Sequence, residues 1–240
     1  MKSSTGDDLP MWRAVIFASA LLSVAVFGCA HVGPPMSREQ RVQALRDQAA
    51  KVSSVKGRVW VSAKSPEGSI SFPADVAIDR TSVKEQKLRL AAIGPFGVTY
   101  SLLVLSGGRL TWIDYDRKTV TRVERTWHGL PVGALPELFL GICPRLEGGG
   151  KFTLKFTESE SEAVLKEISG ELRGRRGEVE TYTVGLSEHA GPEEFGLPRE
   201  IELHGVRDGK EVRVRLSWRG ERIWNETVAP VAFVVPPTEF

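Results

Sequence analysis

The sequence has no strong excess of charge of either sign. Its 240 residues include 32 Lys and Arg and 30 Asp and Glu, a formal net charge of +2. A nucleic-acid-binding domain carries a clear basic surplus, so none is indicated. After residue 28 the chain also lacks any run of about 20 apolar residues, the length that a membrane-spanning helix needs. The length after residue 28 fits one domain with an ample hydrophobic core.

The longest apolar run lies near the N-terminus, from Ala14 to Phe27, and Lys2 and Arg13 precede it. Its length suits the apolar region of an export signal and is short for a bilayer-spanning helix. The run closes on Val26-Phe27-Gly28-Cys29, which resembles the bacterial lipobox. The sequence therefore predicts a signal peptide over residues 1–28 and a diacylglyceryl lipid on Cys29. An uncleaved membrane anchor with an incidental cysteine is the alternative.

A lipid on Cys29 would determine where the protein resides. Each buried methylene contributes about 0.8 kcal/mol, so two or three acyl chains hold a protein on a membrane almost permanently. Ala30 occupies the position where an Asp signals retention in the inner membrane in many bacteria. We expect the periplasmic face of the outer membrane, with residues 29–36 as a tether and residues 37–240 as one monomeric domain.

Cysteine is scarce, since Cys29 and Cys143 are the only two. With Cys29 lipidated, Cys143 has no partner for a disulfide or a Cys-ligated metal site. The four histidines lack the close spacing of a zinc site and have no nucleophile motif near them. The glycines before Lys151 do not form a phosphate-binding loop, because Phe152 follows where Ser or Thr would be needed. We expect no enzyme activity, no metal and no cofactor.

An amphipathic helix is predicted at the start of the body. Ser37 and Gln40 match the capping box that begins a helix. Apolar residues then recur at helical spacing, which predicts one buried face. They are Val42, Leu45, Ala49 and Val52.

After Lys56 the apolar residues recur at every second position, which predicts strands. Turn signals such as Gly94-Pro95 and Gly107-Gly108 leave connections too short for parallel crossovers. The predicted strands cover residues 57–64, 68–79, 86–93, 98–106, 109–115, 118–125, 151–157, 162–173, 178–186, 197–206 and 211–219, with a further short one at 222–228.

Residues 129–146 interrupt the strands with an almost wholly apolar, proline-broken run. Ala134 to Leu140 suits a short helix, with Pro136 in its first turn and Gly141 at its end. A helix that is apolar all round needs burial all round. The pattern predicts a mainly β fold with some α (α+β), in which a strongly curved antiparallel sheet of about 11 strands wraps around helices.

Three segments resemble the LolB family of outer-membrane lipoprotein receptors: Lys87 to Tyr100, the strand Leu102 to Leu105, and Leu135 to Ile142. The resemblance extends over residues 37–230 and is strongest between 86 and 144. It implies an unclosed β-barrel with a helical lid, LolA/LolB-like, that holds the acyl chains of a passenger lipoprotein. It also implies as partners a LolA-like soluble periplasmic carrier, its acylated cargo and outer-membrane lipid.

The resemblance gives the loop Gly94, Pro95, Phe96 and Gly97 a role in membrane insertion of cargo, with Phe96 as the exposed apolar residue. Two glycines and a proline form a tight turn that pushes a side chain outward, and an aromatic ring suits a bilayer interface. The alternative is that Phe96 folds back onto the core, as most phenylalanines do.

A ligand cavity would be lined by the inward faces of the strands and by the apolar helix. The same side chains suit an ordinary packed core, so both readings stay open. The candidates are Trp60, Val61, Leu90, Tyr100, Leu102, Val104, Trp112, Leu135, Leu138 and Phe139.

Arg173, Arg175 and Arg176 form the most basic turn. A solvated surface is the plain interpretation, and a docking surface for an acidic carrier is the functional one. Two other functions also remain open for the whole chain. One is an envelope lipoprotein of the same fold that binds another hydrophobic ligand, and the other is a structural or scaffolding lipoprotein without a cavity.

Overall fold

The structure is a computed structural model that describes residues 37–82, 85–127, 129–144, 151–156, 164–173, 179–207 and 209–238. These residues belong to the unit Met36–Phe240, and the chain's other unit is Met1–Pro35. The predicted signal peptide, Cys29 and the tether therefore lie outside the described residues. Among the described residues, no helix has the length and apolar character needed to cross a bilayer.

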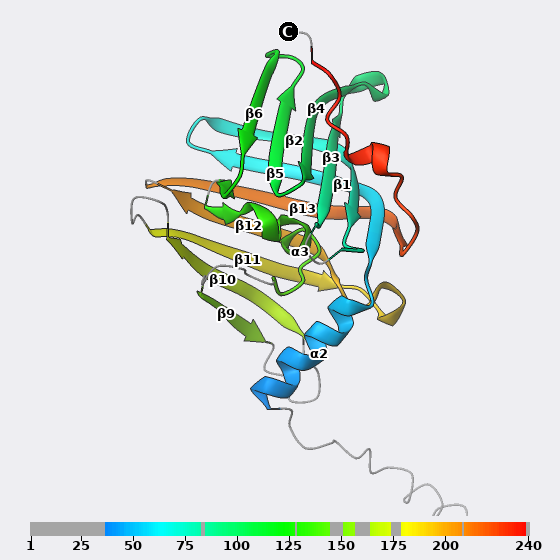
Figure 1. Ribbon diagram of the computed structural model, residues 1–240. Coiled ribbons are helices and arrows are strands. Elements are labelled where there is room, and N and C mark those ends of the chain that lie inside the picture. Colours follow the sequence, from blue (N-terminus) through cyan, green and yellow to red (C-terminus); the bar gives the residue numbers. More distant parts are fainter. Residues whose placement is uncertain are drawn as a thin grey trace, which may run out of the picture. The chain divides into compact units, whose positions relative to one another are not determined.

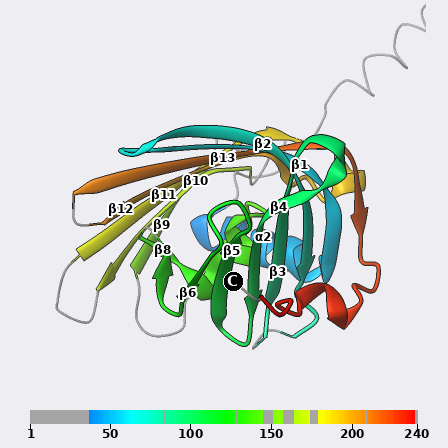
Figure 2. The same cartoon turned by 90° about the horizontal axis from the view of Figure 1, so that it is seen from above.

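Eleven strands within the described residues form one antiparallel sheet, in the order β6-β5-β4-β3-β2-β1-β13-β12-β11-β10-β9. β6 and β9 are its two edges, so the sheet is open, and it curves around the interior (Figures 1 and 2). The predicted fold class is confirmed. The bounds are β1 Ser54–Ser65, β2 Gly68–Asp79, β3 Lys87–Ile93, β4 Thr99–Ser106, β5 Arg109–Asp114, β6 Thr119–Val123, β9 Lys151–Phe156, β10 Leu165–Arg173, β11 Val179–His189, β12 Pro198–Arg207 and β13 Lys210–Trp224.

The chain enters this sheet in the middle. β1 to β6 run outward to one edge, and β9 to β13 return from the other edge until β13 pairs with β1. Val55 thus lies opposite Trp224, although they are 169 positions apart in the sequence. The sheet therefore consists of two antiparallel meanders that are joined by the longest strand, β13.

The predicted break after residue 219 is wrong, because β13 is one strand that continues to Trp224. Its pairing shifts between Lys56 and Arg58 of β1, which marks a bulge. Gly220, with φ of 70°, lies in the bulge and allows the strand to bend and continue. A short pair, β7 (Thr126–Trp127) with β8 (Leu130–Pro131), was not predicted.

Helix α2 (Arg38–Ala50) begins with the predicted capping box. The Ser37 hydroxyl accepts a hydrogen bond from the Gln40 amide at 3.2 Å, and the Ser37 amide donates to Gln40 Oε1 at 2.7 Å. The predicted apolar face is confirmed, because its residues belong to the main core or pack against it.

The apolar run forms the 3-10 turn η2 (Val132–Ala134) and the short helix α3 (Leu135–Leu138), which is shorter than predicted. Pro136 lies in its first turn and Gly141, with φ of 67°, follows its end, as expected. The curved sheet encloses α3 on its inner face (Figure 2). Because α3 has almost no polar side, it is stable only when it is buried on all sides, as it is here.

A second, smaller core lies on the outer face of β3, β4 and β5. The C-terminal segment, which contains the 3-10 turn η4 (Pro230–Phe233), covers it. Its buried members are Ala91, Leu102, Val104, Ile113, Val228 and Phe233. This part of the sheet therefore has apolar side chains on both faces.

Candidate functional site

The inner face of the sheet brings together half of the predicted cavity residues. Val61 of β1 and Leu90 of β3 lie in the main core with three α3-segment residues, Leu135, Leu138 and Phe139. These three have at most 1% of their surface exposed. In this conformation the α3 segment therefore packs directly on the inner face and fills the space beneath it.

Trp60, Leu102 and Val104 lie on the outer face, so the prediction that they face inward is wrong. Alternate strand residues point to opposite faces, and the inward positions of β1 are Val59 and Val61. Trp60 is consequently 42% exposed. Leu102 and Val104 are buried under the C-terminal segment in the second core. The Leu102–Leu105 run is apolar throughout, which is why the sequence pattern did not distinguish its two faces.

Tyr100 and Trp112 lie at the inner face where it is partly open. The pairing of β3 with β4 shifts between Ala92 and Ile93, so Tyr100 does not follow the alternation of Leu102 and Val104. Trp112 pairs across the sheet with Leu103, is 37% exposed and donates from Nε1 to Ser101 Oγ at 2.7 Å. The Tyr100 ring meets the Phe72 ring edge to face, with centroids 5.7 Å apart. Ile70, on the same face of β2 as Phe72, is 60% exposed. We call Ile70, Phe72, Tyr100 and Trp112 the apolar rim.

A buried polar cluster joins the two helices. Arg80 Nη1 donates to the carbonyl oxygens of Ala49 and Val52, at the end of α2, at 3.0 and 2.9 Å. Its Nη2 lies 3.5 Å from Oε1 of Glu137 in α3, and Gln86 Nε2 donates to the same oxygen at 3.1 Å. We call Arg80, Gln86 and Glu137 the helix latch.

The helix latch was not identified from the sequence. Glu137 is the only charged residue between 129 and 144, in an otherwise apolar run. It is 2% exposed in the structure. A single carboxylate in such a run is itself a signal, because a buried charge must find a partner. The latch fixes α3 against the end of α2.

Phe96 lies at the tip of the turn between β3 and β4, within the 3-10 segment Pro95–Gly97. Its side chain is fully exposed, as the resemblance to the LolB family implies, and does not fold back onto the core. Its φ of 65° is in the left-handed region, which costs a residue with a side chain about 1–3 kcal/mol. The Gly94 amide donates to the Val98 carbonyl at 2.8 Å and closes the turn. The turn thus holds a large apolar ring away from the body of the protein.

The predicted docking residues contribute no described side chain to the inner-face site. The side chain of Arg173, and all of Arg175 and Arg176, lie outside the described residues, so the docking surface stays a prediction. Cys143 is a half-buried free thiol. Its pKa is raised to about 11, mainly because the thiol is buried and to a smaller extent because the negative charge of Glu137 lies nearby. Among the described side chains, no three metal-ligating groups gather.

No family model and no curated protein matches the sequence. Solved structures with a similar arrangement include a DUF1329 family protein from Desulfovibrio piger, with 8% identity, coverage of 82% of this chain and 96% of that one, and a TM-score of 0.48. A LolA superfamily protein from Nitrosomonas europaea has 10% identity, coverage of 81% and 97%, and a TM-score of 0.43. The lipoprotein LppX from Mycobacterium tuberculosis has 12% identity, coverage of 80% and 99%, and a TM-score of 0.34. At such values nothing about ligand or partner transfers from these structures to this chain.

Proposed function

We propose that this protein is an outer-membrane lipoprotein that accepts the acyl chains of other lipoproteins from a soluble periplasmic carrier and inserts them into the membrane. This is the function that the resemblance to the LolB family implies. It works by binding and transfer, without a catalytic step, a metal or any cofactor except its own lipid on Cys29. The cargo's acyl chains would bind at the inner face of the sheet.

The observation that carries this proposal is the full exposure of Phe96 on a strained, closed turn. An exposed phenylalanine does not contribute the roughly 1.5–3 kcal/mol of stability that its burial would give. Its left-handed backbone conformation lowers the stability further. Such a feature is retained where the exposed ring has an apolar destination. The acyl region of a bilayer is a destination that fits a lipid-anchored protein.

Uptake of acyl chains at the inner face requires movement of the α3 segment. Leu135 and Leu138 are fully buried against the sheet, so a chain must displace them to bind there. The apolar rim gives an entry point, because Ile70 and Trp112 already expose apolar surface at this face. The helix latch then sets how readily the segment opens.

A transfer assay tests the proposal with a loaded carrier, the purified protein and liposomes. Phe96→Glu should accept cargo as the wild type does but deliver at least about tenfold less of it, because a carboxylate resists entry into the hydrocarbon region. Val179→Glu is the matched control, since Val179 is also an exposed apolar residue but lies at the start of β11. Equal delivery by Phe96→Glu and the wild type would refute the role of this turn.

The tight packing of the α3 segment favours a second candidate, an envelope scaffolding lipoprotein whose interior never opens. Native mass spectrometry after incubation with a loaded carrier separates the two. Bound acylated cargo supports transport. A protein that stays free of acyl chains, with a working carrier as the positive control, supports the scaffold.

A further inference from the structure

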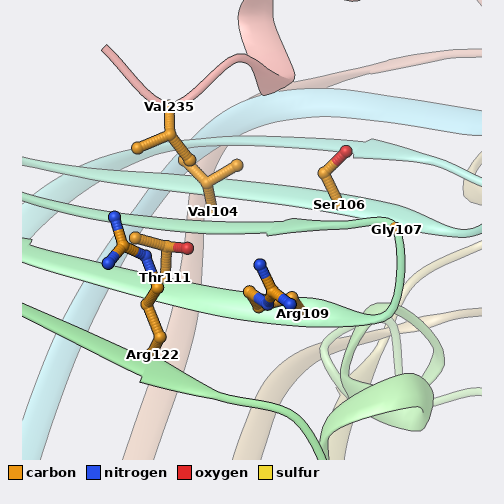
Figure 3. Close-up of a pocket in the computed structure, with 7 residues that line it drawn as sticks. All are labelled: Val104, Ser106, Gly107, Arg109, Thr111, Arg122 and Val235. Atoms are coloured by element: carbon orange, nitrogen blue, oxygen red, sulfur yellow. The ribbon is translucent and has the colours of Figure 1, made fainter. Parts of the chain in front are cut away.

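A pocket of about 400 Å³ lies on the outer face of the sheet, away from the proposed acyl site. The strands β4, β5 and β6 form its floor, and Val235 of the C-terminal segment forms a wall (Figure 3). Ligand pockets start at about 300 Å³, so its volume suits a small molecule or a headgroup.

The polar lining of this pocket is entirely basic or neutral. Arg109 and Arg122 rise from β5 and β6 on the same side as Val235, and the hydroxyls of Ser106 and Thr111 lie nearby (Figure 3). No carboxylate is among the described residues that line it. Guanidinium groups and hydroxyls together supply the donors that a phosphate group prefers.

The two arginines differ in how they are held. Glu124 Oε1 accepts from Arg109 Nε and Nη2 at 3.1 and 2.9 Å, which orients that guanidinium and leaves Nη1 outside the ion pair. Within the described part of the chain, no carboxylate pairs with Arg122. Arg122 is therefore the cation with most capacity for an anionic ligand.

The surroundings indicate that the ligand is amphipathic. Val104 and Val235 give the pocket an apolar side, which a free phosphate ion would not use. Two further cations occupy the same face. Arg89 pairs across the sheet with Val104, and Lys87 Nζ lies 5.9 Å from the centroid of the Phe233 ring. Val231 and Val234 of the covering segment are exposed. Basic and exposed apolar side chains together suit the surface of an anionic membrane.

From this arrangement we propose that the outer-face pocket binds the phosphate-bearing headgroup of an anionic membrane lipid. Arg122 and Arg109 hold the phosphate, Ser106 and Thr111 donate to its oxygens, and Val235 contacts the first apolar carbons. This site is separate from the inner face and from Phe96. It does not depend on acyl-chain transfer.

Phosphorus NMR of the full chain in a neutral detergent, titrated with dihexanoyl phosphatidylglycerol, tests the site. The wild type should show a saturable shift of the lipid phosphorus signal. Arg122→Ala should weaken binding by about tenfold or more, because it removes a charge-assisted interaction. Arg219→Ala is the matched control: Arg219 is an exposed arginine on β13, outside the pocket, and its loss should change nothing.

Three outcomes would overturn the proposal. One is equal binding by the wild type and Arg122→Ala, with both proteins showing the same thermal unfolding. Another is a loss of binding in Arg219→Ala as large as in Arg122→Ala, which would show general attraction to positive charge. The third is inorganic phosphate binding as tightly as the lipid, which would make the ligand a free anion. Phe96→Glu should bind the lipid as the wild type does, so failure of this site and failure of the transfer function are distinguishable.

Discussion

At the scale of single residues, two of the glycines in the sheet, Gly170 and Gly185, have opposite surroundings. A Cβ on Gly170 would lie 2.4 Å from the ring of Tyr182, which is buried. A Cβ on Gly185 would meet nothing closer than 3.9 Å. Gly170 is thus required for the Tyr182 ring to pack where it does against β10, whereas Gly185 is not required for packing.

We expect Gly170→Ala to lower the free energy of unfolding by about 1–3 kcal/mol, because the methyl group forces the Tyr182 ring out of its place. Gly185→Ala should leave it unchanged or raise it slightly, because alanine loses less backbone entropy on folding. Urea unfolding of both variants measures the difference. Equal stability of the two would show that the Tyr182 ring moves aside at no cost.

At the scale of secondary structure elements, strand positions and the first helix were predictable, because alternation and capping are local patterns. The extent of β13 was not, since a bulge and a strand end leave the same irregular pattern at residues 219–222. The inward side of β4 was also not predictable, because Leu102 to Leu105 are apolar on both faces. The helix latch depends on Arg80 and Gln86, both in the connection between β2 and β3, meeting Glu137 of α3.

The helix latch should contribute more to stability than an exposed ion pair. Glu137→Ala leaves Arg80 buried without its carboxylate, and we expect a loss of about 3–5 kcal/mol in the free energy of unfolding. Asp75→Ala removes the exposed Arg58–Asp75 ion pair, in which Nε and Oδ1 are 3.0 Å apart. It should lower the free energy of unfolding by less than about 1 kcal/mol. Denaturant unfolding compares them. Similar small losses would mean that α3 is not held by the latch.

At the scale of the whole molecule, the main core shields two weak acids from water. Burial raises the pKa of Cys143 from 9.0 to about 11 and that of Tyr182 from 10.0 to about 12. Both groups are protonated in the folded and unfolded chains at neutral pH. Above pH 9 the unfolded chain ionises first, so alkali favours unfolding.

We expect the free energy of unfolding to be constant with respect to these groups below pH 9 and to fall as the pH rises through about 11 for Cys143 and about 12 for Tyr182. Cys143→Ser should remove the first part of this decline, because a serine hydroxyl does not titrate there. Urea unfolding at a series of alkaline pH values measures the curve. An identical decline in Cys143→Ser would show that the thiol is not shielded in the fold.

The sequence by itself determined the strand alternation, the capping box of α2, the tight turn around Phe96 and the need to bury the apolar run. Each of these depends on neighbours only a few residues away. The tertiary structure alone decided that Trp60, Leu102 and Val104 face outward, that Glu137 meets Arg80, and that Val235 completes a pocket with Arg122. These features depend on which distant segment covers each face of the sheet. A local pattern of apolar residues does not predict which segment that is.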